Sequence, residues 1–249
     1  MKQLFIHLTF FLIMVLINVL ANIIPINGQT TAEISNKIDV LITPASYAFM
    51  IWGFIYILLG IWILRGFFRS RRNSPEYTET SFLFIVSCLL NSFWIIVWHY
   101  ELFFFSVLFI LFLWITLFLL YKKSRKVTGH FLAYAHVSIY LGWITVAAIV
   151  NISYYLKYIS WDQFSLSDNL WAILLLLIAT IIGIGFRIIQ HDWIFPLVIV
   201  WSFIAIGIKN GANHIPIAFT TYVLAFILII VTLGLKRRTT KKLALDKNG

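Results

Sequence analysis

The sequence predicts an all-α fold: a polytopic transmembrane helix bundle of about eight spans. Apolar residues make up 61% of the 249 positions and charged residues only 11%, whereas a soluble domain carries about 25% charged residues. The apolar stretches are continuous and do not alternate, which excludes the strands of a membrane barrel. Helices satisfy their own backbone hydrogen bonds, as a segment in lipid must.

Eight apolar runs approach or reach the length of about 20 residues that a helix needs to cross a bilayer. They cover residues 4–24, 45–64, 81–98, 102–121, 131–151, 169–186, 194–209 and 215–235. The seventh run is the shortest. The first run is longer than the core of about 7–15 residues in a secretory signal, so we expect an uncleaved first helix.

The basic residues predict the topology. If the N-terminus is cytoplasmic, alternate loops place 16 of the 19 Lys and Arg residues inside and 3 outside. This asymmetry is typical of multi-pass membrane proteins and predicts that both termini are cytoplasmic. The net charge of +10 therefore indicates contact with anionic lipid headgroups, and no nucleic acid is expected. The abundance of Ile, Phe, Lys and Asn, without a transit peptide, favours a bacterial plasma membrane.

Three sets of aromatic and polar residues lie inside the apolar runs, each on one helical face. The sets are Trp52 with Tyr56; Asn91 with Trp94 and Trp98; and Tyr140 with Trp143, Ala147 and Asn151. Their spacings of three, four, seven and eleven residues match the helical repeat. Lipid-facing helices do not need such residues, so the three faces predict a pocket for a flat, apolar ligand. Helix packing and interhelical hydrogen bonds are the alternative for each residue alone.

Three segments carry a family resemblance. TPASYAFMIWGFIY (43–56), LLNSFW (89–94) and YLGWITVAAIVN (140–151) resemble signatures of the second, third and fifth helices of the TspO/MBR family. Its members are called tryptophan-rich sensory proteins or translocator proteins. The resemblance covers about residues 1–155 and implies a five-helix core there. We therefore expect three additional transmembrane helices at 156–235 and a basic cytoplasmic tail at 236–249.

The resemblance also implies a pocket beneath the first long loop, where relatives bind porphyrins or other apolar ligands. Indoles stack on such flat rings, at about 0.5–1.5 kcal/mol per pair beyond area burial. The ligand-binding residues would be Trp52, Tyr56, Asn91, Trp94, Tyr140, Trp143 and Ala147. Tryptophans near span ends are expected in the interfacial aromatic belts instead. These are Trp62, Trp98, Trp161, Trp171 and Trp193.

The expected function is that of an integral membrane binding or sensory protein for a flat hydrophobic ligand, with a tetrapyrrole such as porphyrin as the candidate. A permease for a small apolar or amphipathic solute and a structural membrane subunit remain alternatives. Catalytic motifs and paired carboxylates are absent, so no enzyme is expected, with porphyrin degradation kept open. The single Cys88 excludes a cysteine metal cluster, and neither a metal nor a required cofactor is expected. The expected partners are membrane lipid, the ligand and, as an open alternative, a second copy in a homodimer.

Overall fold

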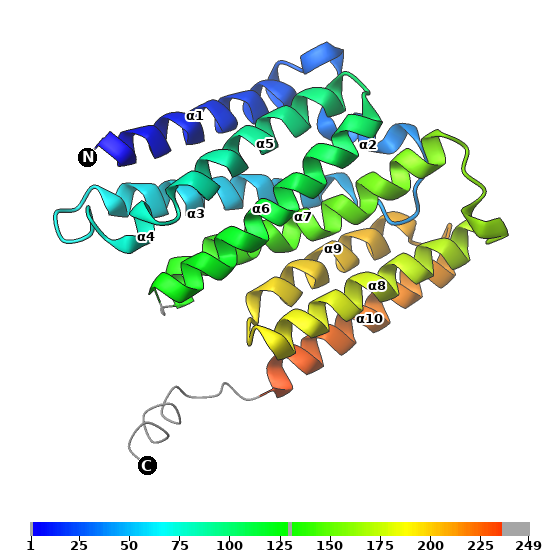
Figure 1. Ribbon diagram of the computed structural model, residues 1–249. Coiled ribbons are helices and arrows are strands. Elements are labelled where there is room, and N and C mark those ends of the chain that lie inside the picture. Colours follow the sequence, from blue (N-terminus) through cyan, green and yellow to red (C-terminus); the bar gives the residue numbers. More distant parts are fainter. Residues whose placement is uncertain (1, 129–130, 236–249) are drawn as a thin grey trace.

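The structure, a computed structural model, describes residues 2–128 and 131–235, without the side chains of residues 131 and 132. Within these ranges the chain forms helices and loops and no strand (Figure 1). The α-helices are α1 (Lys2–Ile23), α2 (Thr31–Lys37), α3 (Ile51–Gly66), α4 (Pro75–Thr78), α5 (Ser81–His99), α6 (Phe103–Thr128), α7 (Phe131–Tyr158), α8 (Asp168–Ile189), α9 (Ile194–Asn210) and α10 (Ile215–Gly234). The 3-10 helices are η1 (Ile26–Gly28), η2 (Ser46–Met50) and η3 (Gln163–Ser165).

Each of the eight apolar runs is a helix, which confirms the predicted polytopic helical bundle. Seven helices of the described chain are long and apolar enough to cross a membrane, when α3 is counted together with η2. The eighth, α9, has 17 residues and is about 25 Å long at ~1.5 Å per residue. It is the run that the sequence marked as shortest. The protein is therefore a multi-pass membrane protein; its predicted tail at 236–249 lies outside the described residues.

Helix α7 lies at the centre of the bundle, with α3 and α6 packed against it and α9 on its other side (Figure 1). The contact with α9 depends on Gly142. A Cβ atom at this position would lie 3.0 Å from the Cβ of Val198 and 3.3 Å from the carbonyl oxygen of Phe195. Small residues let transmembrane helices approach closely, so Gly142 permits the tight packing of α9 on α7.

The long loop between α1 and α3 contains a helix, α2, at a position where the sequence predicts only a loop. Thr30 caps it, since its hydroxyl accepts from the backbone N–H of Glu33 at 3.3 Å. The Glu33 carboxylate in turn accepts from the backbone N–H of Thr30 at 2.7 Å, which completes a capping box. Ile34 of α2 is fully buried. Helix α2 thus closes one end of the bundle, which is called the α2 end. The opposite end, where α4 lies, is called the α4 end.

Polar contacts join α9 to the rest of the bundle at both ends. At the α4 end the buried Asp192 carboxylate accepts from the hydroxyl of Tyr121 at 2.7 Å and from that of Ser138 at 2.8 Å. At the α2 end Asn210 donates to the carbonyl of Leu41 at 2.8 Å. Residue 155, the predicted boundary between core and extension, lies inside α7, and that boundary stays a prediction.

Candidate functional site

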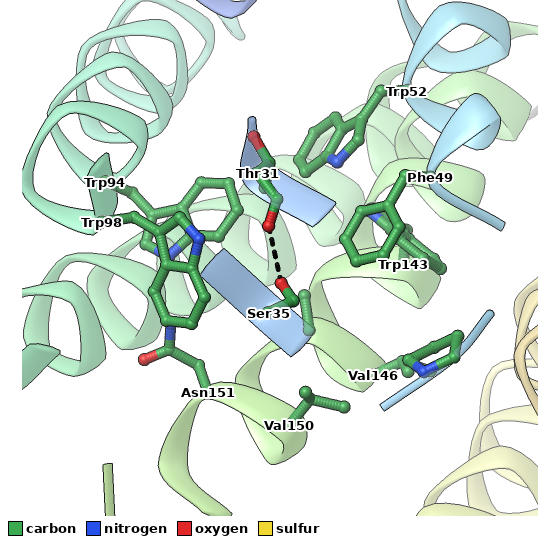
Figure 2. A pocket seen from close by; sticks show the side chains of 12 residues that line it. Thr31, Ser35, Phe49, Trp52, Trp94, Trp98, Trp143, Val146, Val150 and Asn151 are labelled. Atoms are coloured by element: carbon green, nitrogen blue, oxygen red, sulfur yellow. Dashed lines mark hydrogen bonds between the residues drawn. The ribbon is translucent and has the colours of Figure 1, made fainter. Parts of the chain in front are cut away.

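A small cavity of about 40 Å³ lies under α2, between η2, α3, α5 and α7. Its lining is mainly aromatic and aliphatic, with hydroxyl groups from α2 and one amide, and none of the described lining residues is charged. The lining residues are Thr31, Ser35, Pro44, Phe49, Trp52, Trp94, Trp98, Trp143, Val146, Ala147, Val150 and Asn151. Figure 2 shows Trp94 and Trp98 on one side of the cavity and Trp52, Phe49 and Trp143 on the other.

The aromatic rings around the cavity pack against one another. The ring centroid of Trp52 lies 5.9 Å from that of Trp94 and 6.3 Å from that of Trp143, which it meets edge-on at 88°. Phe49 meets Trp143 edge-on as well, at 5.9 Å and 85°. These separations and angles are those that aromatic pairs prefer. The rings therefore fill most of the space that a flat ligand would need.

Four of the seven predicted ligand-binding residues line the cavity: Trp52, Trp94, Trp143 and Ala147. The helical spacing explains why they converge. Trp94 and Trp98 are one turn apart on α5, while Trp143 and Ala147 are one turn apart on α7. Helices α3, α5 and α7 thus bring these four residues to one place, and their role in ligand binding stays a prediction.

The other three predicted residues, Tyr56, Asn91 and Tyr140, lie behind this wall. Asn91 is fully buried: its Oδ1 accepts from Asn18 of α1 at 2.8 Å, and its Nδ2 donates to the Tyr140 hydroxyl at 2.8 Å. Tyr56 stacks on Trp52, with ring centroids 5.8 Å apart. In this arrangement Asn91 and Tyr140 tie α1, α5 and α7 together, and Tyr56 supports Trp52 from behind.

Several donors around the cavity have no hydrogen-bond partner. The indole N–H groups of Trp94, Trp98 and Trp143 and the hydroxyl of Thr31 are buried without a partner in the described part of the chain. Leaving a buried polar group unpaired costs about 1–3 kcal/mol. All four groups belong to residues that line one cavity, so the cavity is chemically suited to a molecule that accepts hydrogen bonds.

Three tryptophans away from the cavity use their N–H groups. Trp62 donates to the Glu76 carboxyl at 2.7 Å, and Trp114 donates to the Thr145 hydroxyl at 2.9 Å. Trp201 donates to the carbonyl of Ala48 at 3.3 Å. The unpaired indoles are therefore a property of the cavity and not of buried tryptophans throughout the bundle.

The family comparison agrees with this geometry. The family model described as TSPO-like protein matches residues 4–234. The chain belongs to the TSPO-like family. The match confirms the resemblance to TspO/MBR proteins and also includes α8, α9 and α10, which lie beyond the segments that carried the resemblance. This TSPO-like chain has no significant match among curated proteins or among solved structures.

Eight of the twelve lining residues of this TSPO-like protein were not among the predicted ligand-binding residues, and two groups of them are instructive. Trp98 was placed on the same helical face as Asn91 and Trp94 but was expected at the membrane interface. The interface prediction is wrong, because Trp98 is only 3% exposed and packs on Tyr154, with centroids 5.0 Å apart. Thr31 and Ser35 come from α2. The sequence signal that indicates this helix is the capping box, a hydroxyl residue at Thr30 followed three residues later by the carboxylate of Glu33.

Side chains from distant helices hold α2 over the cavity of the TSPO-like bundle. The Tyr154 hydroxyl of α7 donates to the carbonyl of Ile34 at 2.9 Å. Lys209 of α9 donates to the side chain of Asn36 at 2.8 Å, and Lys37 pairs with Glu101 at the α5–α6 turn. Hydrogen bonds from Thr30 also lower the pKa of the Glu33 carboxyl below its ordinary value. Helix α2 thus depends on a small number of individual polar contacts.

A larger groove, of about 420 Å³, lies between α3, α7 and α9 on the outside of the TSPO-like bundle. Its described lining is apolar apart from Trp201, and it includes Met50 and Phe54, which are 68% and 52% exposed. Such a surface on membrane-spanning helices faces lipid. Among the residues described, no group of three or more His, Cys, Asp or Glu is close enough to hold a metal ion.

Proposed function

We propose that this TSPO-like membrane protein binds a flat hydrophobic ligand, a tetrapyrrole in the first instance, in the cavity under α2. The observation that carries the proposal is the convergence of four indoles and one phenyl ring on a single uncharged cavity. A flat π-system can replace the edge-on and tilted contacts that these rings now make with one another. Binding would report ligand levels at the membrane without any chemical change in the ligand.

The size of the cavity adds a condition to this proposal. Its volume of about 40 Å³ is far below the ~300–1,000 Å³ of ordinary ligand pockets. A tetrapyrrole therefore requires the aromatic rings to separate and α2 to move. Helix α2 is the wall best suited to move, because it has seven residues, lies outside the spans and is held by the contacts of Tyr154, Lys37 and Lys209.

The orientation in the membrane is part of the proposal. The charge asymmetry supports both termini in the cytoplasm of a cell bounded by a plasma membrane, which puts α2 on the outer face. A hydrophobic ligand would then reach the cavity from the outer side, at the point where α2 covers the ends of α5 and α7.

The test is a titration of detergent-purified protein with protoporphyrin, which follows tryptophan fluorescence and the porphyrin absorption band. Trp143→Phe removes a lining indole, and Trp171→Phe is the control because Trp171 of α8 lies outside the cavity lining. We expect saturable, stoichiometric binding that Trp143→Phe weakens and Trp171→Phe leaves intact. Linear quenching of equal slope in all three proteins would mean partitioning into detergent and would overturn the proposal.

A further inference from the structure

The unpaired indole N–H groups of the cavity make no hydrogen bond to the polar side chains of its own wall. Of the polar lining residues, Ser35 donates to the backbone carbonyl of Thr31 at 2.8 Å, as Figure 2 shows. The Oδ1 atom of Asn151 accepts from the Ser106 hydroxyl at 3.0 Å. These polar groups are thus engaged with one another or with a neighbouring helix. An acceptor on a bound molecule would pair the indole N–H groups that the described part of the chain leaves without a partner.

Among the described residues, no cationic side chain lines the cavity to neutralise a negative charge. The cations at the α2 end are directed elsewhere: Lys37 to Glu101, Lys157 to Asp168 and Lys209 to Asn36. They are surface groups, whereas Trp94, Trp98 and Trp143 are at most 4% exposed. Moving an ionised carboxylate into such a site is very costly unless a partner charge accompanies it. Neutral acceptors, such as carbonyl or ester oxygens, carry no such cost.

We propose that the ligand of this cavity is an uncharged flat ring bearing carbonyl-type acceptors at its edge. The N–H groups of Trp94, Trp98 and Trp143 and the hydroxyl of Thr31 donate to these acceptors, and the indole faces cover the ring. The inference rests on the proposed function and specifies the ligand class of that same site. It separates this class from free porphyrin acids, whose carboxylates are ionised, and from purely hydrocarbon ligands, which leave the donors unpaired.

Three porphyrins with one ring system and different edges test the inference. Protoporphyrin carries two carboxylates, its dimethyl ester carries two neutral ester groups, and etioporphyrin carries alkyl groups alone. Each is titrated into the purified full-length protein in the same detergent, with correction for its partitioning into empty micelles. We expect the dimethyl ester to bind about tenfold or more tightly than either of the others, which corresponds to one or two hydrogen bonds gained.

Variants connect this preference to the named donors. Trp94→Phe and Trp98→Phe each remove an unpaired N–H while keeping an aromatic ring. We expect them to weaken dimethyl-ester binding more than etioporphyrin binding, so that the ester-over-alkyl preference falls several-fold. Thermal unfolding in the same detergent checks that both variants fold. Thr232→Val is the control, because the Thr232 hydroxyl is likewise buried and unpaired but lies on α10, outside the cavity lining.

The outcomes separate the two proposals. Tightest binding of the free acid would overturn the uncharged class, and equal binding of ester and alkyl porphyrin would overturn the role of the donors. In both cases saturable binding would still support the proposed function. If none of the three porphyrins binds saturably, the proposed function itself fails, and this inference fails with it.

Discussion

The bundle has an aromatic cluster at each end, and the two clusters differ in their hydrogen bonds. At the α4 end Trp62 lies between the rings of His7 and His136, with centroid distances of 5.8 Å and 5.1 Å. Its N–H donates to Glu76 at 2.7 Å, and its backbone carbonyl accepts from Tyr77 at 2.8 Å. His7 is bonded to Ser81 through Nε2, and only its Nδ1 lacks a partner.

At the α2 end the cluster of Trp52, Trp94, Trp98 and Trp143 surrounds a cavity, and three of its four indole N–H groups are buried without a partner. The two clusters lie on the same helices, α3, α5 and α7 among them, so the difference does not come from the type of helix. It shows that aromatic residues alone do not identify a binding site. Unpaired donors around a cavity are the feature that separates the α2 end from the structural cluster at the α4 end.

The largest expected effect is on stability at the α4 end. Trp62→Phe leaves the Glu76 carboxyl group, only 3% exposed, without its N–H donor. We expect the free energy of unfolding in detergent to fall by about 2–3 kcal/mol. Glu76→Gln keeps an acceptor for Trp62 and serves as the milder control. A Trp62→Phe protein as stable as the parent would show that hydrogen bonds stabilise this cluster no more than the cluster at the α2 end.

At the α2 end a matching substitution is expected to cost less. Trp98→Phe removes an N–H that has no partner, so only packing is lost, and we expect a decrease of about 1 kcal/mol in unfolding free energy. The same variant should bind dimethyl-ester porphyrin several-fold more weakly. Thermal unfolding and ligand titration on one protein preparation measure both quantities. A stability loss equal to that of Trp62→Phe would remove the distinction between the clusters.

The contact between α7 and α2 gives a kinetic prediction. Tyr154→Phe deletes the hydroxyl that donates to the carbonyl of Ile34, a bond of about 1 kcal/mol. Since ligand entry requires α2 to move, association and dissociation should both become faster, as seen in stopped-flow fluorescence. Tyr158→Phe, which changes a ring that is 55% exposed on the same helix, is the control. Unchanged rates would mean that the ligand enters by another route.

The smallest effect concerns pH. Because the folded-state pKa of Glu33 is lowered by Thr30, its ionised form stabilises α2 above the ordinary glutamate pKa. This contribution is lost as the pH falls through the lowered pKa, so amide exchange in α2, corrected for its intrinsic pH dependence, should rise in acid. Glu33→Gln cannot ionise, and the rise should be absent in this variant. An identical acid response in both proteins would assign the effect to other groups.

The sequence predicted the spans well because hydropathy depends on composition alone. Trp52, Trp94, Trp143 and Ala147 could be predicted because helical spacing and the family signatures fix their faces. The role of Asn91 could not, since its partner Asn18 lies 73 residues away and no local pattern indicates the pair. The burial of tryptophans near the span ends could not be predicted either.

Trp62 and Trp98 lie near span ends and were expected at the interface, which is wrong for both. Loops and neighbouring helices cover them, leaving them 4% and 3% exposed. Helix α2 was missed because seven residues are too few for a periodic signal, and only its capping box indicates a helix. What the sequence could not supply was therefore the contact between segments that are distant in the chain.

The most direct measurement of the central claim is NMR of the indole N–H groups in protein labelled with ¹⁵N-tryptophan, assigned by single Trp→Phe variants. Without ligand, the signals of Trp94, Trp98 and Trp143 should lack the downfield proton shift of hydrogen-bonded indoles, which Trp62 and Trp114 should show. Dimethyl-ester porphyrin should then shift the three cavity signals and leave that of Trp62 in place. Cavity signals that already resemble Trp62 without ligand, or that do not change when it is added, would show that these indoles are not free donors of a binding site.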